Sequence, residues 1–213
     1  MPYMSCLDNF KVIKEVVSKL QAKSNLIVVT KNRSLEIILP IIKTGHLHFG
    51  ENKVQEAKKK WSEFLTYNTN IKLHLIGKLQ SNKAKEAFSL FDFIHTLDNE
   101  KLAKIFADLE KNSARKIKYF IQVNIANESQ KNGIDHTLLN EFVNYCRNDL
   151  SLNIIGLMCI PPLDLDPSPF FKKMEELKLN YNLNELSMGM SSDYKEALHY
   201  GSTYLRIGSA IFK

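Results

Sequence analysis

Eight short apolar or β-branched runs recur along the chain, and segments with helical periodicity lie between them. The runs are residues 26–30, 46–49, 73–76, 93–97, 119–123, 154–160, 185–188 and 204–207. Consecutive runs are not joined by tight hairpin dipeptides, so they predict parallel strands connected by helices. Eight such strands favour a closed (β/α)8 TIM-type barrel. The runner-up, a flavodoxin-like layered sheet, usually needs only five or six strands.

An additional amphipathic helix is predicted before the first strand. Residues 10–20 place Phe10, Ile13, Val16, Val17 and Leu20 along one face. Because few residues follow the last run, we expect this helix to cover the side where an eighth helix would otherwise lie. The expected organisation is one α/β domain over residues 1–213, a barrel with an extra N-terminal helix and no second β domain.

Composition excludes few classes of function. The 213 residues are 44% hydrophobic and 24% charged, which is ordinary for a globular protein. No run approaches the roughly 20 apolar residues of a membrane span, and no signal peptide is recognisable, so we expect a cytoplasmic protein. Cys6, Cys146 and Cys159 lack CxxC spacing and indicate reduced thiols.

The net charge of +6 is compatible with nucleic-acid binding and with attraction of a phosphorylated ligand. Much of the excess lies in helical segments such as residues 56–60, where a solvated helix face is the ordinary explanation. We therefore expect neither a nucleic-acid nor a membrane partner.

The loops after the seventh and eighth runs are rich in glycine and serine. In a (β/α)8 barrel, phosphate groups typically bind at these two loops. Gly189 and Gly208 allow a close approach of the backbone to an anion, while Ser191 and Ser209 offer hydroxyl and N–H groups. Residues 191–193 also resemble the N-cap of a helix that would run to about residue 199. Together the two loops predict a phosphate-binding site.

Two cationic residues lie at the ends of predicted strands. Lys31 closes the first run and precedes a polar turn. If its stem is desolvated, the neutral amine is favoured, which is the form that attacks a carbonyl group. Arg206 shares one strand face with Tyr204, and it either points into the barrel or forms a surface salt bridge.

These residues belong to a larger set of ordered sequence blocks. The blocks are residues 29–31 (VTK), 49–56 (FGENKVQE), 74–83 (HLIGKLQSNK), 123–124 (VN), 128–133 (ESQKNG), 156–162 (GLMCIPP), 186–193 (LSMGMSSD) and 201–212 (GSTYLRIGSAIF). In this order and spacing, the chain resembles the pyridoxal phosphate homeostasis proteins, which share the barrel of the alanine racemase N-terminal domain. The resemblance spans nearly the whole chain.

The resemblance implies a role for each site residue. Lys31 would carry pyridoxal 5′-phosphate (PLP) as an internal aldimine, and Arg206 would lie against the pyridine nitrogen. Ser191 and the backbone of Gly208 and Ser209 would hold the phosphate, and Asn52 and Met188 would line the pocket near the ring. Two residues depart from the family pattern: Lys78 stands where histidine is frequent, and Lys213 replaces a usual glycine. Neither is expected to touch the residues just assigned.

An arginine beside the pyridine nitrogen disfavours its protonation and weakens the ring as an electron sink. In the racemases a second β-rich domain brings an acid–base tyrosine, and no such domain is expected here, although Tyr204 or His74 could substitute. We therefore expect a protein of intracellular PLP homeostasis that buffers or delivers the cofactor without robust catalysis. The alternative is a PLP-dependent amino-acid racemase. The expected partners are PLP and, transiently, PLP-dependent apo-enzymes, and the expected state is a monomer or weak dimer.

Other kinds of site are less well supported. His46 and His48, with His74 nearby, could form a metal site, but no acidic ligand motif accompanies them, so we expect no metal. Gly77-Lys78 is not a P-loop, because Lys72 occupies the place of the first glycine. No GxSxG motif indicates a serine nucleophile.

Overall fold

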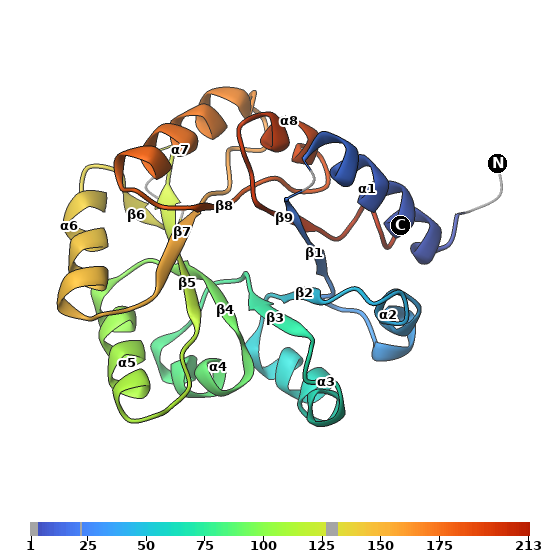
Figure 1. Cartoon of the computed structure of the whole chain (residues 1–213), viewed down its shortest axis with the longest axis horizontal. Helices are drawn as coiled ribbons and strands as arrows, with labels where there is room; N and C mark the ends of the chain where they lie inside the picture. Colours follow the sequence, from blue (N-terminus) through green and yellow to red (C-terminus); the bar gives the residue numbers. More distant parts are fainter. Residues whose placement is uncertain (1–3, 22, 127–131) are drawn as a thin grey trace.

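The computed structural model describes residues 4–21, 23–126 and 132–213. Eight parallel strands form a closed barrel in the order β4-β3-β2-β1-β9-β8-β7-β5, closed by pairing of β4 with β5 (Figure 1). They are β1 Asn25–Val29, β2 His48–Glu51, β3 Lys72–Leu75, β4 Phe93–Leu97, β5 Lys118–Asn124, β7 Ile154–Met158, β8 Glu185–Ser187 and β9 Tyr204–Ile207. The predicted (β/α)8 barrel is confirmed.

One short strand lies outside the predicted pattern. β6, Ile134–Asp135, pairs with Val123 and Asn124 at the end of β5 and takes no part in closing the barrel. Residues 128–131 of the block 128–133 that contributed to the resemblance lie outside the described residues.

Helices surround the strands (Figure 1). They are α1 Cys6–Leu20, α2 Leu35–Ile42, α3 Val54–Tyr67, α4 Ala84–Leu90, α5 Glu100–Lys111, α6 Leu139–Asn144, α7 Ser168–Asn180 and α8 Tyr194–His199, with a 3₁₀ turn η1 at Ser81–Lys83 and a π-helical turn η2 at Tyr145–Asp149. α1 begins with a capping box formed by Ser5 and Asp8. It packs against both α2 and α8, so it covers the side of the barrel predicted for it.

Strand alternation divides the core into two regions. Outward-facing residues such as Val28, Leu205 and Ile207 pack against the helices in the larger cluster. Inside the barrel, a smaller cluster consists of Ile27, Phe93, Phe120, Met158 and Tyr204. Arg206 is also buried, which decides between its two predicted placements in favour of the interior.

Close backbone approaches at two glycines shape the C-terminal end of the barrel. A Cβ at Gly77 would lie 2.2 Å from the carbonyl oxygen of Asn52, and a Cβ at Gly208 would lie 3.1 Å from Cβ of Val29. Gly77 therefore lets the chain after β3 pass against Asn52, and Gly208 lets the end of β9 lie against β1.

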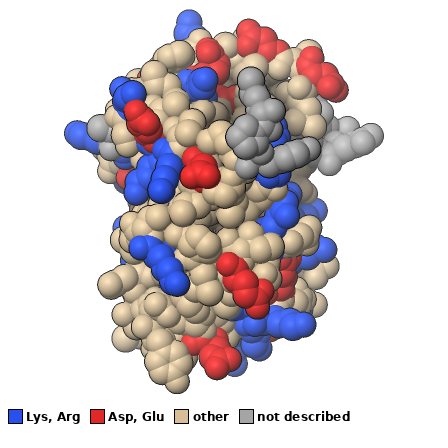
Figure 2. Space-filling view, turned by 90° about the vertical axis from the view of Figure 1, so that its right-hand side faces the viewer, with Lys and Arg blue, Asp and Glu red and all other residues tan. Residues whose placement is uncertain are grey.

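The surface does not gather its charge on the face seen in Figure 2, where basic and acidic side chains are interspersed. Among the described residues, no helix is both long and apolar enough to cross a bilayer. The three cysteines carry free thiols, as expected.

Candidate functional site

A cavity of about 480 Å³ opens at the C-terminal ends of the barrel strands. It is lined by Val29, Lys31, Asn52, Ile76, Ile160, Met190, Ser191, Ser192, Arg206, Gly208, Ser209 and Lys213. The structure thus brings together six of the predicted site residues: Lys31, Asn52, Ser191, Arg206, Gly208 and Ser209. Of the two departures from the family pattern, Lys213 lines the same cavity, whereas Lys78 is exposed and is not among the described lining residues.

Met188 is not among the described residues that line this cavity. It is fully buried in the core between strands and helices. The preceding residue, Ser187, has an inward-facing hydroxyl group that contacts Arg206, so alternation sends Met188 outward. Met190 lines the cavity instead.

Lys31 lies in a turn that follows β1. The N–H of Arg33 donates to the carbonyl oxygen of Thr30 at 3.1 Å, and Asn32 adopts a left-handed φ of 58°, which asparagine tolerates. Lys31 itself is exposed. The condition of a desolvated stem is therefore not met in this structure, because β1 ends two residues earlier and Lys31 lies in the exposed turn.

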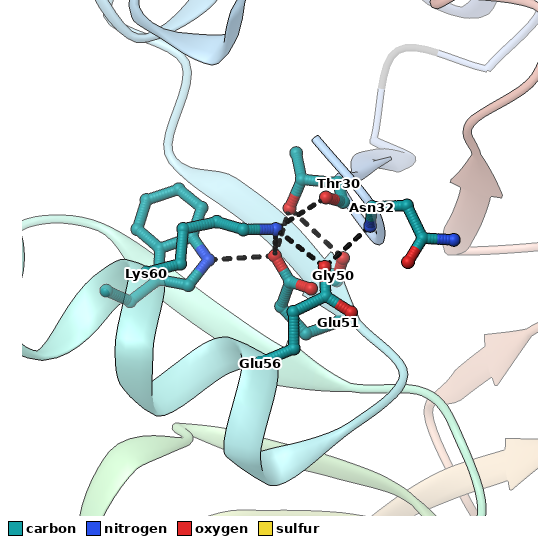
Figure 3. A network of polar contacts seen from close by, with 7 residues as sticks. Thr30, Asn32, Gly50, Glu51, Glu56 and Lys60 are labelled. Carbon is teal, nitrogen blue, oxygen red and sulfur yellow. Dashed lines mark hydrogen bonds and ion pairs between the residues drawn. The ribbon is translucent and has the colours of Figure 1, made fainter. Parts of the chain in front are cut away.

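A buried polar network holds the residue before Lys31 (Figure 3). Oε1 of the fully buried Glu51 accepts hydrogen bonds from the Thr30 hydroxyl at 2.6 Å, Lys60 Nζ at 2.8 Å and Trp61 Nε1 at 2.9 Å. Lys60 Nζ also donates to the carbonyl oxygen of Thr30 at 2.7 Å. The side chain and the carbonyl group of Thr30 are thereby both held.

The same network reaches the residue after Lys31. Oε1 of Glu56 accepts from the backbone N–H of Asn32 at 2.6 Å and from Lys60 Nζ at 3.1 Å (Figure 3). Hydrogen bonds therefore fix the backbone on both sides of Lys31, at Thr30 and at Asn32, while the Lys31 side chain is exposed. Glu51 and Glu56 belong to a sequence block of the resemblance, but their function could not be predicted from it. Glu56 and Lys60 lie one turn apart on α3, whereas Glu51 meets Lys60 only because α3 packs on β2.

Arg206 is held at the inner end of the cavity by two acceptors. Nη1 donates to Ser187 Oγ at 2.7 Å and Nη2 to the carbonyl oxygen of Cys159 at 2.9 Å. Burial lowers the pKa of the guanidinium from its ordinary value, although arginine keeps its charge in proteins. The site thus contains a fixed, buried cation.

The loops after β8 and β9 supply hydrogen-bond donors. Within the described part of the chain, no acceptor takes a hydrogen bond from the backbone N–H groups of Ser191, Ser192 and Ser209. The Ser191 hydroxyl accepts from Ala210 N at 3.1 Å and so links the two loops. Free N–H groups beside a serine hydroxyl are typical of an anion site.

Glycine is needed at position 189 for the backbone conformation of the loop and its packing on α8, not for a close approach to an anion. Its φ is 92°, and a Cβ there would lie 2.6 Å from Cβ of Ala197. The predicted helix is confirmed as α8, which starts at Tyr194. Asp193 does not cap it with its side chain but accepts a hydrogen bond from Met190 N at 2.5 Å.

The histidines do not form the metal site that was considered. No group of three or more potential metal-binding side chains occurs among the described residues. His46 and His48 do not share a strand face, because His46 precedes β2 and its ring packs against Phe10 and Phe49 on the outside of the barrel.

Comparison with known proteins gives consistent matches. Residues 5–213 match the family model described as alanine racemase, N-terminal domain. The chain is 36% identical over 197 residues to the pyridoxal phosphate homeostasis protein of Haemophilus influenzae, covering 88% of this chain and 83% of that protein. For the protein of the same description from Escherichia coli K12, the identity is 34% over 196 residues, covering 88% and 84% of the two chains.

Solved structures agree with these matches. PipY of Synechococcus elongatus PCC7942, solved with PLP bound, superposes with a TM-score of 0.88 at 34% identity, covering 98% of this chain and all of that chain. Alanine racemase of Corynebacterium glutamicum gives a TM-score of 0.72 at 13% identity, covering 96% of this chain and 60% of that one. This second likeness shows the shared fold.

Proposed function

The chain belongs to the family of pyridoxal phosphate homeostasis proteins, and from that premise we propose that it binds PLP as a Schiff base on Lys31 and buffers or delivers the cofactor. One observation carries the proposal: a lysine amine, a buried guanidinium and unpaired backbone N–H groups line one cavity. PLP has an aldehyde, a ring nitrogen and a phosphate, which these three kinds of group can bind.

The size and the donors of the cavity fit this cofactor. A volume of about 480 Å³ lies in the range of roughly 300 to 1,000 Å³ that is typical of small-molecule sites. The walls include apolar Val29, Ile76 and Ile160, which suit a flat aromatic ring. When bound, PLP supplies an electrophilic aldehyde and an electron-withdrawing ring.

We assign the phosphate to Ser191, Gly208 and Ser209, on the support of their shared cavity and their donor groups. Arg206 would face the pyridine nitrogen, and Asn52 would line the ring. Met188 stays in the core and takes no contact in this assignment. A single domain over residues 1–213 would contain the whole site.

The positions of the two side chains that could act as a second acid–base group support PLP binding without robust catalysis. Racemisation requires a second proton donor and acceptor opposite the lysine. The two internal candidates, Tyr204 and His74, are buried in the barrel and are not among the described residues that line the cavity. Neither of the two internal candidates that the racemase alternative would use therefore lies at the described wall of the cavity.

A transfer assay tests the function. The purified protein is loaded with PLP, freed of excess ligand by gel filtration, and mixed with a PLP-dependent apo-enzyme whose recovered activity is followed over time. We expect recovery of the apo-enzyme and, in parallel, no inversion of L-amino acids by chiral chromatography. Retention of PLP without any recovery would contradict delivery, and rapid inversion would establish the racemase.

A further inference from the structure

A continuous hydrogen-bonded chain of side chains runs through the interior of the barrel and ends at Arg206. His48 Nδ1 lies 2.9 Å from His74 Nε2, and His74 Nδ1 lies 2.9 Å from His95 Nε2. His95 Nδ1 is 2.8 Å from Ser187 Oγ, the atom that also accepts from Arg206 Nη1 at 2.7 Å. The five residues come from β2, β3, β4, β8 and β9.

The middle of this chain is completely shielded from water. His74 and His95 are 0% exposed, and each ring stacks on a phenylalanine: His74 on Phe93 with centroids 4.2 Å apart, and His95 on Phe120 at 4.3 Å. Burial lowers the pKa of both imidazoles well below the ordinary value. Both rings are therefore neutral at neutral pH, and a buried polar chain of this kind is stable only when every link is made.

The donor and acceptor atoms of imidazole allow only two proton arrangements, or orders, along these linked histidines. A neutral imidazole has one N–H donor and one acceptor nitrogen, so three linked rings must all donate in the same direction. In one order each histidine carries its proton on Nε2, and in the other each carries it on Nδ1. A mixed arrangement would place two donors or two lone pairs face to face in the buried interior.

Arg206 selects between the two orders. Its guanidinium can only donate, so Ser187 Oγ must accept from it. The single hydroxyl proton of Ser187 is then satisfied by donation to His95 Nδ1, since the described residues offer it no other acceptor. This choice gives the Nε2–H tautomer at His95, His74 and His48 in turn, with the last proton at the end of the barrel opposite the cofactor cavity.

We propose that Ser187 and the histidines behind it are positioning residues for Arg206, fixing its guanidinium where it faces the ring nitrogen of bound PLP. The inference rests on the proposed function for the identity of the ligand. The second acceptor, the carbonyl oxygen of Cys159, restrains only Nη2 of the guanidinium. Without Ser187, the guanidinium could therefore rotate about its hydrogen bond to Cys159. None of the three histidines lines the cavity, so they act only through Ser187.

The first test needs no cofactor. ¹⁵N NMR of the histidine side chains at pH above 7 should show Nε2–H tautomers at His48, His74 and His95 in the wild-type protein. Ser187→Ala should remove this uniform order, Ser187→Thr should restore it, and His46→Gln, which alters a buried histidine outside the chain, should leave it unchanged. Mixed tautomers in the wild-type protein would overturn the proposed chain.

The second test uses PLP. Ser187→Ala should raise the dissociation constant of PLP by roughly tenfold, the scale of one lost hydrogen bond to a charged group, and should shift the visible band of the bound cofactor. Ser187→Thr should recover both values. Wild-type affinity and spectrum in Ser187→Ala would overturn the positioning role alone. Failure of the wild-type protein to bind PLP would overturn the proposed function, and the positioning role with it.

Discussion

Lys60 Nζ lies 2.8 Å from Oε1 of the fully buried Glu51, and these two groups together hold the turn that carries Lys31. The ammonium bonds the carbonyl oxygen of Thr30, and Glu56, its other partner, bonds the backbone N–H of Asn32. The lysine at the cavity is therefore exposed at its side chain but fixed at its backbone. A fixed backbone restricts where the amine can reach, which favours one attack geometry on an aldehyde.

Lys60→Met should damage both stability and cofactor binding. It leaves the carboxylate of Glu51 buried, with Oε2 already lacking a partner among the described residues, and breaking a buried ion pair in this way costs about 3 kcal/mol or more. Urea unfolding measures the loss, and PLP titration should show a lower fraction of bound cofactor at a given concentration. Lys58→Met is the matched control, because that lysine is 62% exposed in its pair with Glu86 and should change stability by less than about 1 kcal/mol. Equal effects of the two substitutions would contradict the role given to the network.

Arg206→Gln should change the electronic environment of the PLP ring more than it changes binding of the PLP phosphate. The substitution removes the buried cation while the donor groups of Ser191 and Ser209 remain, so the visible spectrum of bound cofactor should shift. Competition by inorganic phosphate should stay within about twofold of wild type, since no charged contact to the phosphate is lost. An unchanged spectrum together with a large loss of phosphate competition would place Arg206 at the phosphate instead.

Ser191→Ala should weaken binding of the phosphorylated cofactor selectively. It removes a hydroxyl group from the cavity and the acceptor of Ala210 N, a change worth about 1 kcal/mol or roughly fivefold in affinity. Isothermal titration with PLP and with unphosphorylated pyridoxal should show the loss only for PLP. Ser89→Ala on α4, far from the cavity, serves as the control. An equal loss for both ligands would argue against a phosphate contact.

The buried histidines should make stability depend on pH. Burial lowers the pKa of His46 and of His48 to about 4, whereas an unfolded chain titrates near the ordinary value of 6.5. The unfolded state therefore binds more protons between these values. The stabilisation is complete above pH 6.5 and is lost as the pH falls toward 4, by up to about 1.4 kcal/mol per pH unit for each histidine.

Urea unfolding at a series of pH values between 7.5 and 4.5 measures this dependence. His46→Gln should reduce its slope, because it removes one buried imidazole without breaking the interior chain, and His199→Gln at an exposed position should not. A stability that rises on acidification over this range would contradict the neutral, buried state of these rings.

The barrel could be predicted from sequence because each parallel strand is a short apolar run and the runs number eight. The cavity residues Ser191 and Gly208 could be predicted as well, since the architecture places strand ends at one face, whereas periodicity alone left Arg206 open between the barrel interior and a surface salt bridge. Details at strand ends could not. Met188 faces the core because it alternates with Ser187, whose hydroxyl group points inward to Arg206, and the apolar run did not show which of the two faces the interior.

Side-chain networks between distant elements were also beyond sequence reasoning. The partnership of Glu51 with Lys60 requires α3 to lie on β2, and the alignment of His48, His74 and His95 requires the stagger of three neighbouring strands. Periodicity indicates which face a residue occupies but not which atoms meet across strands. The exposure of Lys31 could not be predicted either, because it depends on the residue at which β1 ends.

The central claim is the covalent attachment of PLP to Lys31. Wild-type protein and Lys31→Ala are incubated with PLP, reduced with borohydride, digested and analysed by mass spectrometry, with Lys78→Ala as a matched exposed lysine that does not line the cavity. We expect a reduced pyridoxyl group on the peptide that contains Lys31 in the wild-type and Lys78→Ala proteins, and its loss in Lys31→Ala. Equal labelling of Lys31→Ala, or a wild-type protein without the adduct, would contradict it.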